Sequence, residues 1–386
     1  MPTSQVTTYW DYLRLPELLE LQGGLEGNDA ELSEDELHFI VVHQVFELWF
    51  KLMLRELRLA RDKMAAPWVE EETIPYVVHH LRRVNEIFRL AVEQFRVMET
   101  LTPQDFLAFR SKLGTASGFQ SFQMREIEAI MGLSADQRAA QGHTDPLQSL
   151  QAAVQQARRG THLLERVLQA RQDTSLRQAL HAWLFRTPIQ GSRPTDPDDA
   201  SVVENFLQAY LAALDQHQSA QMAPLLADSR QASAVRAQFA AMLDSAQAFF
   251  HATDVADEQE RPQVQRIRAG ILFIESYRDL PLLAWPRLLI DTVVEMEELF
   301  VLWRTRHARM VERVIGRRVG TGGSSGVDYL DETARYRIFP ELWAVRTLLL
   351  PRATLPPLQK SAVYSFVAEH QTSTPGNGRA ADTPAT

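Results

Sequence analysis

The spacing of apolar residues is helical along almost the whole chain of 386 residues. Apolar side chains recur every three or four residues, and no run alternates between apolar and polar residues beside hairpin turns. Ser33, followed by three acidic residues, is typical of a helix start, so we expect a helix from there to about Asp62. Thr102 before Pro103 indicates another start. The sequence therefore predicts an all-α fold, with further helices at about 71–98, 118–131, 146–171, 175–185, 199–225, 229–252, 259–280, 286–316, 327–336 and 340–350.

Polar segments rich in proline, glycine and acidic residues separate several of the predicted helices. They cover residues 132–146, 189–199 and 253–262. None is long enough to separate independent domains, and no internal repeat of solenoid period is present. We therefore expect one helical-bundle domain over residues 1–367, with an inserted helical region at 186–262. A disordered tail is expected at 368–386, where Ser, Thr, Pro and Gly replace the apolar period.

The composition disfavours several classes of site and partner. The formal net charge is −9 at pH 7, so a broad phosphate-binding surface and a nucleic-acid partner are not expected. The chain contains no cysteine, which excludes disulfides, thiolate zinc sites, iron–sulfur clusters and thiolate-ligated haem. No apolar run approaches the roughly 18 residues needed to span a bilayer, and residues 1–10 do not resemble an export signal. We therefore expect a cytoplasmic protein that does not enter a membrane.

One histidine, His307, lies on an apolar face of the helix predicted at 286–316. Its neighbours on that face are Phe300, Trp303, Met310 and Val314. An imidazole in such surroundings can ligate a metal or a haem iron. The alternative is a core histidine hydrogen-bonded to a carbonyl, which is the commoner case for a single buried histidine.

A glycine-rich segment, GTGGSSG at 320–326, follows this helix. Glycine lets the backbone approach a small ligand closely, so we expect a mobile cover over a buried cofactor. The alternative is a rigid turn that needs glycine only for its backbone angles. The segment lacks the form GxxxxGK[ST], which excludes a phosphate-binding loop.

A second histidine, His43, shares a helical face with Phe39, Phe46 and Phe50, which are spaced four, three and four residues apart. An imidazole within an aromatic stripe can lie over a flat macrocycle. Again the alternative is an ordinary core histidine.

An arginine, Arg110, is predicted to share a helical face with Phe106 and Leu113. A guanidinium beside aromatic rings suits a planar carboxylate in a dry pocket. The alternative is a helix-end arginine that pairs with Asp105 or with solvent. The segment GTASGFQS at 114–121 precedes a helix. Its small residues can admit a substrate or a diatomic ligand, or can form an ordinary N-cap loop.

Five segments carry a family resemblance: YWDYL at 9–13, HQVFELWFKLMLREL at 43–57, FRSKLGTASGFQSFQ at 109–123, Trp303 to Gly326, and FPELWAVRT at 339–347. Together they resemble the tryptophan 2,3-dioxygenase family over most of the chain. The resemblance implies an all-α homotetramer that depends on haem b. It also implies a reaction, the insertion of both atoms of O2 across the C2–C3 bond of the indole of L-tryptophan. The product is N-formyl-L-kynurenine, the first step of the kynurenine pathway.

The resemblance further implies roles for individual residues. His307 matches the axial ligand of the haem iron, and His43 matches the distal histidine that hydrogen-bonds the indole N–H. Arg110 matches the clamp on the substrate carboxylate, and Thr321 matches the contact to its ammonium group. The residues expected around the indole are Phe39, Phe106 and Leu113, and those expected beside the haem and O2 are Ser117, Gly118, Trp303 and Arg304. Tyr9 and Tyr12, in an N-terminal arm at 1–30, are expected to reach the pocket of a neighbouring subunit.

Two other functions stay open at this point. One is a related haem enzyme that oxidises a substituted tryptophan or another indole. The other is a non-catalytic haem protein that senses or stores a ligand. Arg110 and Thr321 favour the enzyme, because a haem carrier does not need a clamp for an amino acid.

Overall fold

The structure, a computed structural model, describes residues 7–134, 137–138, 145–158, 160–225, 232–318 and 326–364. Within these ranges it consists of helices and turns without a strand, and one isolated bridge joins Ile189 to Ser192. The predicted all-α fold is therefore confirmed. The predicted tail at 368–386 lies outside the described residues.

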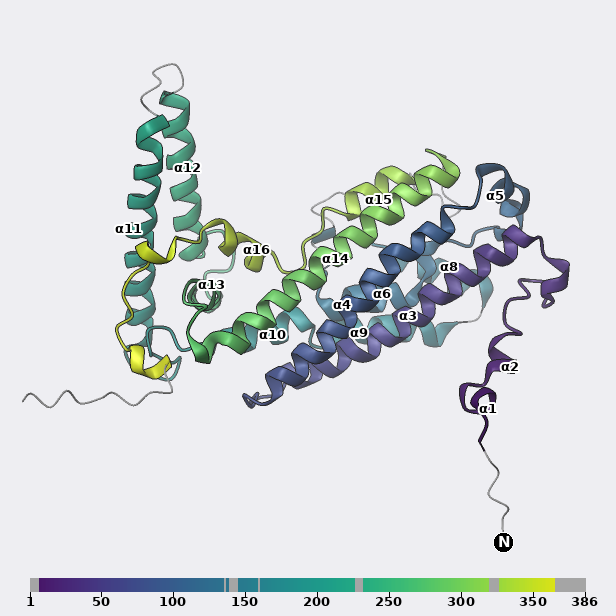
Figure 1. Ribbon diagram of the computed structural model, residues 1–386, viewed down its shortest axis with the longest axis horizontal. Coiled ribbons are helices and arrows are strands. Elements are labelled where there is room, and N and C mark those ends of the chain that lie inside the picture. Colours follow the sequence, from purple (N-terminus) through teal and green to yellow (C-terminus); the bar gives the residue numbers. More distant parts are fainter. Residues whose placement is uncertain are drawn as a thin grey trace, which may run out of the picture.

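Three long helices lie side by side and form the body of the molecule (Figure 1). They are α3 (Glu34–Met64), α4 (Thr73–Met98) and α14 (Ala284–Ile315). The middle helix, α4, packs against both of the others. Its Phe88 is fully buried, and the centroid of its ring lies 5.3 Å from that of Phe300 on α14. A single apolar core thus runs between the three helices.

Local chemistry sets the ends of these helices. Ser33 caps α3, since its hydroxyl oxygen accepts a hydrogen bond of 3.2 Å from the Glu36 N–H, as the sequence predicts. Thr102 caps α5 (Pro103–Phe109) in the same way. The helix α14 ends at Gly316, whose φ of 63° lies in the region that favours glycine.

Four shorter helices follow in the chain. They are α6 (Phe122–Met131), α8 (Leu147–Ala157), α9 (Thr161–Gln172) and α10 (Leu176–Leu184). Of these, α6 and α10 pack against α3, α9 packs against α6, and α8 packs against α9. The single helix predicted at 146–171 is wrong, because the chain turns between α8 and α9 at Arg158 and Gly160, whose φ angles are 52° and 85°. The helix predicted at 118–131 is likewise divided into a 3-10 turn, η3 (Gly118–Gln120), and α6.

A pair of helices, α11 (Asp199–Leu225) and α12 (Ala232–Phe250), stands apart from the long helices in Figure 1. The helix α13 (Arg261–Ser276) contacts both members of the pair and also α10 and α14. Arg268 of α13 holds the end of α12 by donating to Asp254 at 2.6 Å and to the Phe249 carbonyl at 2.7 Å. The helices predicted in this part of the chain are confirmed.

The remaining elements are short. The helices are α1 (Tyr9–Leu13), α2 (Leu15–Leu18), α15 (Val327–Thr333) and α16 (Pro340–Thr347), and the 3-10 turns are η1 (Asp29–Glu31), η2 (Arg110–Leu113), η4 (Pro281–Leu283), η5 (Arg352–Thr354) and η6 (Ser361–Tyr364). The helices α1 and α2 extend away from the long helices (Figure 1), whereas α15 packs on α14.

The helix α3 is long and apolar enough to cross a membrane by length and composition alone, which corrects the expectation that no run approaches this limit. A window of this helix has a mean hydropathy of 1.4, and 28% of that window is buried within the chain. Core helices of soluble proteins pass the same test. The reason is that apolar residues also occupy the outward face of α3, where Val41, Leu48 and Leu52 are exposed.

Candidate active site

His43 and Phe39 lie one turn apart on α3 with their rings in contact, at a centroid distance of 4.0 Å. The Nδ1 atom of His43 is 2.8 Å from the carbonyl oxygen of Phe39. Because a carbonyl can only accept, this bond assigns the proton of a neutral ring to Nδ1. The Nε2 atom then carries the lone pair and can accept a hydrogen bond from a ligand.

The protein surroundings favour the neutral form of His43. Desolvation by burial lowers the pKa of this imidazole below its ordinary 6.5, outweighing the Phe39 carbonyl, which raises it, and His38 lowers it further. The side chain is nevertheless accessible to solvent. A ligand can therefore reach the neutral ring of His43, whose acceptor nitrogen is Nε2.

His307 of α14 lies between two aromatic rings. Phe95 of α4 stacks on it at 5.7 Å, with 15° between the ring planes, and Trp303 lies at 5.3 Å. Phe46 of α3 contacts Phe95 at 4.9 Å. These contacts join the helix that carries His43 to the helix that carries His307.

His307 has the properties of an axial haem ligand. Burial lowers its pKa to about 4, with smaller contributions from His43 and Arg125, so its ring is neutral at pH 7. Within the described ranges neither ring nitrogen has a hydrogen-bond partner. The same residues contain no group of three or more His, Cys, Asp or Glu side chains that could hold a metal ion. A single free imidazole among aromatic rings fits a haem better than it fits a metal ion held by protein side chains alone.

The structure brings the expected aromatic residues to His43. The ring of Phe39 lies 5.9 Å from Phe106 and 5.5 Å from Phe109, both on α5. Leu113 of η2 packs against the same apolar core. The helices α3 and α5 therefore supply the aromatic rings around Phe39, beside His43.

The turn that carries Arg110 is fixed to the start of α3. Arg110 is half-buried and begins η2. Two residues later, the Lys112 ammonium donates to Glu36 of α3 at 2.7 Å and to Glu26 at 3.2 Å. These two ion pairs hold η2 beside the helix of His43, and they raise the pKa of Lys112.

The turn at Ser117 and Gly118 is held against α3 as well. Glu47, one turn after His43, accepts hydrogen bonds from the Ser121 hydroxyl at 2.7 Å and from the Gln123 amide at 2.8 Å. The Ser117 hydroxyl accepts from the Phe119 N–H at 3.4 Å. Among the described residues the Ser117 hydroxyl has no acceptor for its own proton.

Two expected site residues, Tyr9 and Tyr12, lie apart from this site. Tyr9 and Tyr12 belong to α1 and are 71% and 80% exposed, and α1 extends away from the long helices (Figure 1). Thr321 lies outside the described residues.

Arg304, expected beside the haem, is engaged in a buried network. Its guanidinium donates to Glu128 at 2.9 Å and to the Thr333 carbonyl at 3.0 Å, and it lies 4.1 Å from the centroid of the Phe300 ring. These contacts join α14 to α6 and α15. In contrast, the indole N–H of Trp303 is buried and has no acceptor among the described residues.

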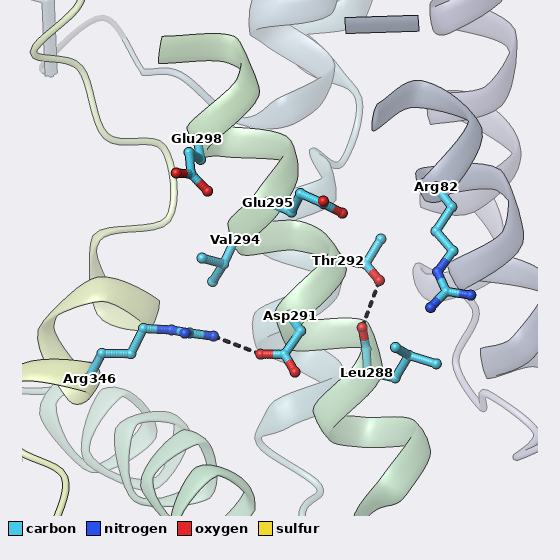
Figure 2. A pocket seen from close by; sticks show the side chains of 8 residues that line it. All are labelled: Arg82, Leu288, Asp291, Thr292, Val294, Glu295, Glu298 and Arg346. Atoms are coloured by element: carbon cyan, nitrogen blue, oxygen red, sulfur yellow. Dashed lines mark hydrogen bonds and ion pairs between the residues drawn. The ribbon is translucent and has the colours of Figure 1, made fainter. Parts of the chain in front are cut away.

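A pocket of about 370 Å³ between α4, α14 and α16 does not coincide with this site (Figure 2). It is lined by Arg82, Leu288, Asp291, Thr292, Val294, Glu295, Glu298 and Arg346. Arg346 donates to Asp291 at 2.8 Å across one side of the pocket. Such a charged lining does not suit a porphyrin or an indole.

Sequence reasoning missed Phe95, Phe109 and Arg125. Phe95 and Phe109 were not singled out because each lies on a different helix from the histidine or aromatic residue that it contacts. Arg125 lies in the first turn of α6, two residues beyond the segment 109–123 that carries the family resemblance.

Comparisons with known proteins show the family of this chain. A family profile described as tryptophan 2,3-dioxygenase matches residues 2–349. The chain belongs to this family. It is 46% identical to "Tryptophan 2,3-dioxygenase 2" of Ralstonia nicotianae over 94% of this chain and 98% of the relative. It is 44% identical to the tryptophan 2,3-dioxygenase of Sorangium cellulosum over 94% of this chain and 88% of the relative.

A third relative of this chain has a name that differs from those of the first two. It is the "Tryptophan 2,3-dioxygenase-like protein" of Xanthomonas campestris pv. campestris, which is 47% identical over 70% of this chain and 99% of the relative. The family resemblance inferred from the five sequence segments is thus confirmed.

Proposed function

We propose that this chain is a haem-dependent tryptophan 2,3-dioxygenase, which combines L-tryptophan with O2 to give N-formyl-L-kynurenine. Both oxygen atoms enter the product as the C2–C3 bond of the indole is cleaved, so no external reductant is consumed. The observation that carries this proposal is the pair of neutral histidines, His43 on α3 and His307 on α14, in a member of this family.

His307 is the residue that would hold the haem. The bound haem would supply the oxygen chemistry, and the neutral imidazole of His307 would be the protein group that holds its iron. The rings of Phe95 and Trp303 restrict the orientation of His307 through packing. The protein therefore fixes the ligand before the cofactor arrives.

His43 orients the indole. Its Nδ1–H is bonded to the Phe39 carbonyl, so Nε2 is the acceptor for the indole N–H. An indole N–H is a very weak acid, and the low pKa of His43 makes the ring a weak base. Orientation, rather than proton removal, is therefore the role of His43 in this proposal.

Arg110 binds the substrate carboxylate, and Phe39, Phe106 and Leu113 enclose the indole. The turn η2 fixes the position of Arg110 through the Lys112 ion pairs. A guanidinium in an apolar site binds a carboxylate more strongly than it does in water, because the surroundings screen less. This combination selects an amino acid that carries a flat apolar side chain.

We further propose that the chain forms a homotetramer in the cytoplasm, without a membrane or nucleic-acid partner. Tyr9 and Tyr12 would then reach the pocket of a neighbouring subunit. The exposed apolar residues of α3, namely Val41, Leu48 and Leu52, would be covered in the assembly. Tetramer formation accounts for the apolar outer face of α3 without placing that helix in a bilayer.

A substrate panel tests the proposed specificity. The reduced haem protein, mixed with O2, should convert L-tryptophan faster than ring-substituted tryptophans, and tryptamine and indole should react poorly. Formation of N-formyl-L-kynurenine is followed by its near-ultraviolet absorbance. A preference for a substituted indole would instead support the related enzyme, and binding without turnover would support a ligand-binding haem protein.

A further inference from the structure

Phe109 lies at the junction of two segments that carry expected substrate contacts. It is the last residue of α5, which carries Phe106, and the next residue, Arg110, begins η2. The Arg110 backbone N–H donates to the Phe106 carbonyl, so a hydrogen bond also joins the two segments. The Phe109 side chain is only 2% exposed. The junction is therefore anchored in the apolar core by an aromatic ring.

The ring of Phe109 closes a triangle of aromatic contacts with Phe39 and Phe106. Its centroid lies 5.5 Å from that of Phe39 and 5.4 Å from that of Phe106, with interplanar angles of 62° and 83°. The third side, between Phe39 and Phe106, measures 5.9 Å. Both contacts of Phe109 are edge-to-face, which is a preferred geometry for aromatic pairs. Each ring therefore restricts the positions of the other two.

Phe109 stands behind the expected indole wall, by which we mean Phe39 and Phe106. Phe39 is partly exposed, and its ring contacts that of His43 at 4.0 Å. In the part of the chain that the structure describes, the Phe109 ring contacts Phe39 and Phe106 but not His43. A change at position 109 would therefore reach a substrate through the two neighbouring rings and through the backbone of Arg110.

We propose that Phe109 is a positioning residue that sets the substrate specificity of this site. The inference rests on the proposed function. Phe109 fixes the depth of the indole wall through ring contacts, and it fixes the distance from that wall to the carboxylate clamp because it directly precedes Arg110. Side chains in a close-packed core transmit a change of volume to their neighbours. The full ring at position 109 thus selects an unsubstituted indole over one with a group on its benzene ring.

The other possible role of Phe109 is that of an ordinary core residue. Loss of its ring would then lower the stability of the fold and affect all substrates alike. Loss of a positioning residue instead changes the ratio between substrates, because it alters the shape of the site. This ratio is the quantity that separates the two roles.

The test compares L-tryptophan with its 5-methyl and 6-methyl derivatives in the haem-loaded protein. Phe109→Leu should raise the kcat/KM of at least one derivative relative to L-tryptophan about tenfold, which is the discrimination that one methyl group provides in an apolar pocket. Calorimetric binding without O2 should show a change in the ratio of Kd values in the same direction. Phe109→Met should give a smaller change, and it covers the case in which Phe109→Leu does not fold.

Phe206→Leu is the matched control. Phe206 of α11 is 3% exposed and its ring contacts Phe273 at 5.6 Å, so this variant removes the same ring from an equally buried place. It should lower the melting temperature about as much as Phe109→Leu does, because both leave a cavity of similar size. The ratio between the substrates should stay that of the wild type.

Two results would overturn the inference. In one, Phe109→Leu is less stable but keeps or lowers the wild-type ratio, both in kinetics and in binding, which would make Phe109 a core residue only. In the other, Phe206→Leu changes the ratio equally, which would show that lost stability alone alters it. A wild-type chain that loads haem but oxidises none of these substrates would instead refute the proposed function.

Discussion

At the scale of the residue, the two histidines show how environment divides one residue type between two roles. His43 has its Nδ1 proton bound by a carbonyl, so its remaining nitrogen is an acceptor. His307 has no described hydrogen-bond partner and a pKa of about 4, so its lone pair is free at pH 7. The helical spacing predicted both as candidates. It did not predict the contacts that separate their roles, because those depend on backbone atoms and on Phe95 from another helix.

Replacement of His307 tests the assignment of the haem ligand. His307→Ala should abolish stable haem incorporation, because it removes the proposed protein bond to the iron. His43→Ala should retain haem and lose part of the activity. Absorbance of the purified variants measures haem content directly. Normal haem content and spectrum in His307→Ala would contradict the assignment.

Replacement of Arg110 tests the carboxylate clamp. Arg110→Gln should raise the KM for L-tryptophan by roughly ten- to a hundredfold, since a charged hydrogen bond of this kind contributes about 1.5–3 kcal/mol. The small activity towards tryptamine, which has no carboxylate, should change little. Steady-state kinetics with both substrates measures the difference. An equal effect on both would show that Arg110 only supports the local fold.

At the scale of the element, the sequence predicted most helices, including the cap at Ser33 and the end of α14. It failed between α8 and α9, where Arg158 and Gly160 turn the chain although the apolar period continues. It also failed to predict the arrangement of the helices, because ion pairs such as Lys112–Glu36 connect residues that are distant in sequence. The family resemblance supplied the site residues that periodicity alone could not separate from core residues.

The pair of Arg177 and Glu341 joins α10 to α16 at 2.7 Å and makes stability depend on pH. Burial raises the pKa of Glu341, but His181 and Arg177 outweigh it and lower the pKa from 4.5 to about 2. Such a group stabilises the folded chain fully above pH 4.5, and its contribution is lost as the pH falls towards 2. The shift corresponds to about 3 kcal/mol.

Glu341→Gln should therefore lower the free energy of unfolding by about 3 kcal/mol at pH 7 and by only about 1 kcal/mol at pH 3. Urea unfolding at both values measures the difference. Glu258→Gln is the control, because Glu258 is 81% exposed and forms only a surface ion pair with Arg261. A deficit of the same size at pH 7 and pH 3 would contradict the linkage.

At the scale of the whole molecule, the exposed aromatic residues of α1 and the apolar outer face of α3 require a partner surface. The proposed homotetramer would supply it. Deletion of residues 1–13 should raise the KM for L-tryptophan far more than it weakens haem binding, because Tyr9 and Tyr12 would act on a neighbouring pocket. Light scattering of the intact chain should give the mass of four subunits. A fully active monomer would contradict this assembly.

The most direct test of the account is the fate of the oxygen atoms. The reduced haem protein is mixed with L-tryptophan and heavy-isotope O2, and the product is analysed by mass spectrometry. We expect N-formyl-L-kynurenine in which both added oxygen atoms carry the heavy isotope. A product with one heavy atom, or haem binding without any oxygenated product, would contradict the assignment of this chain as a tryptophan 2,3-dioxygenase.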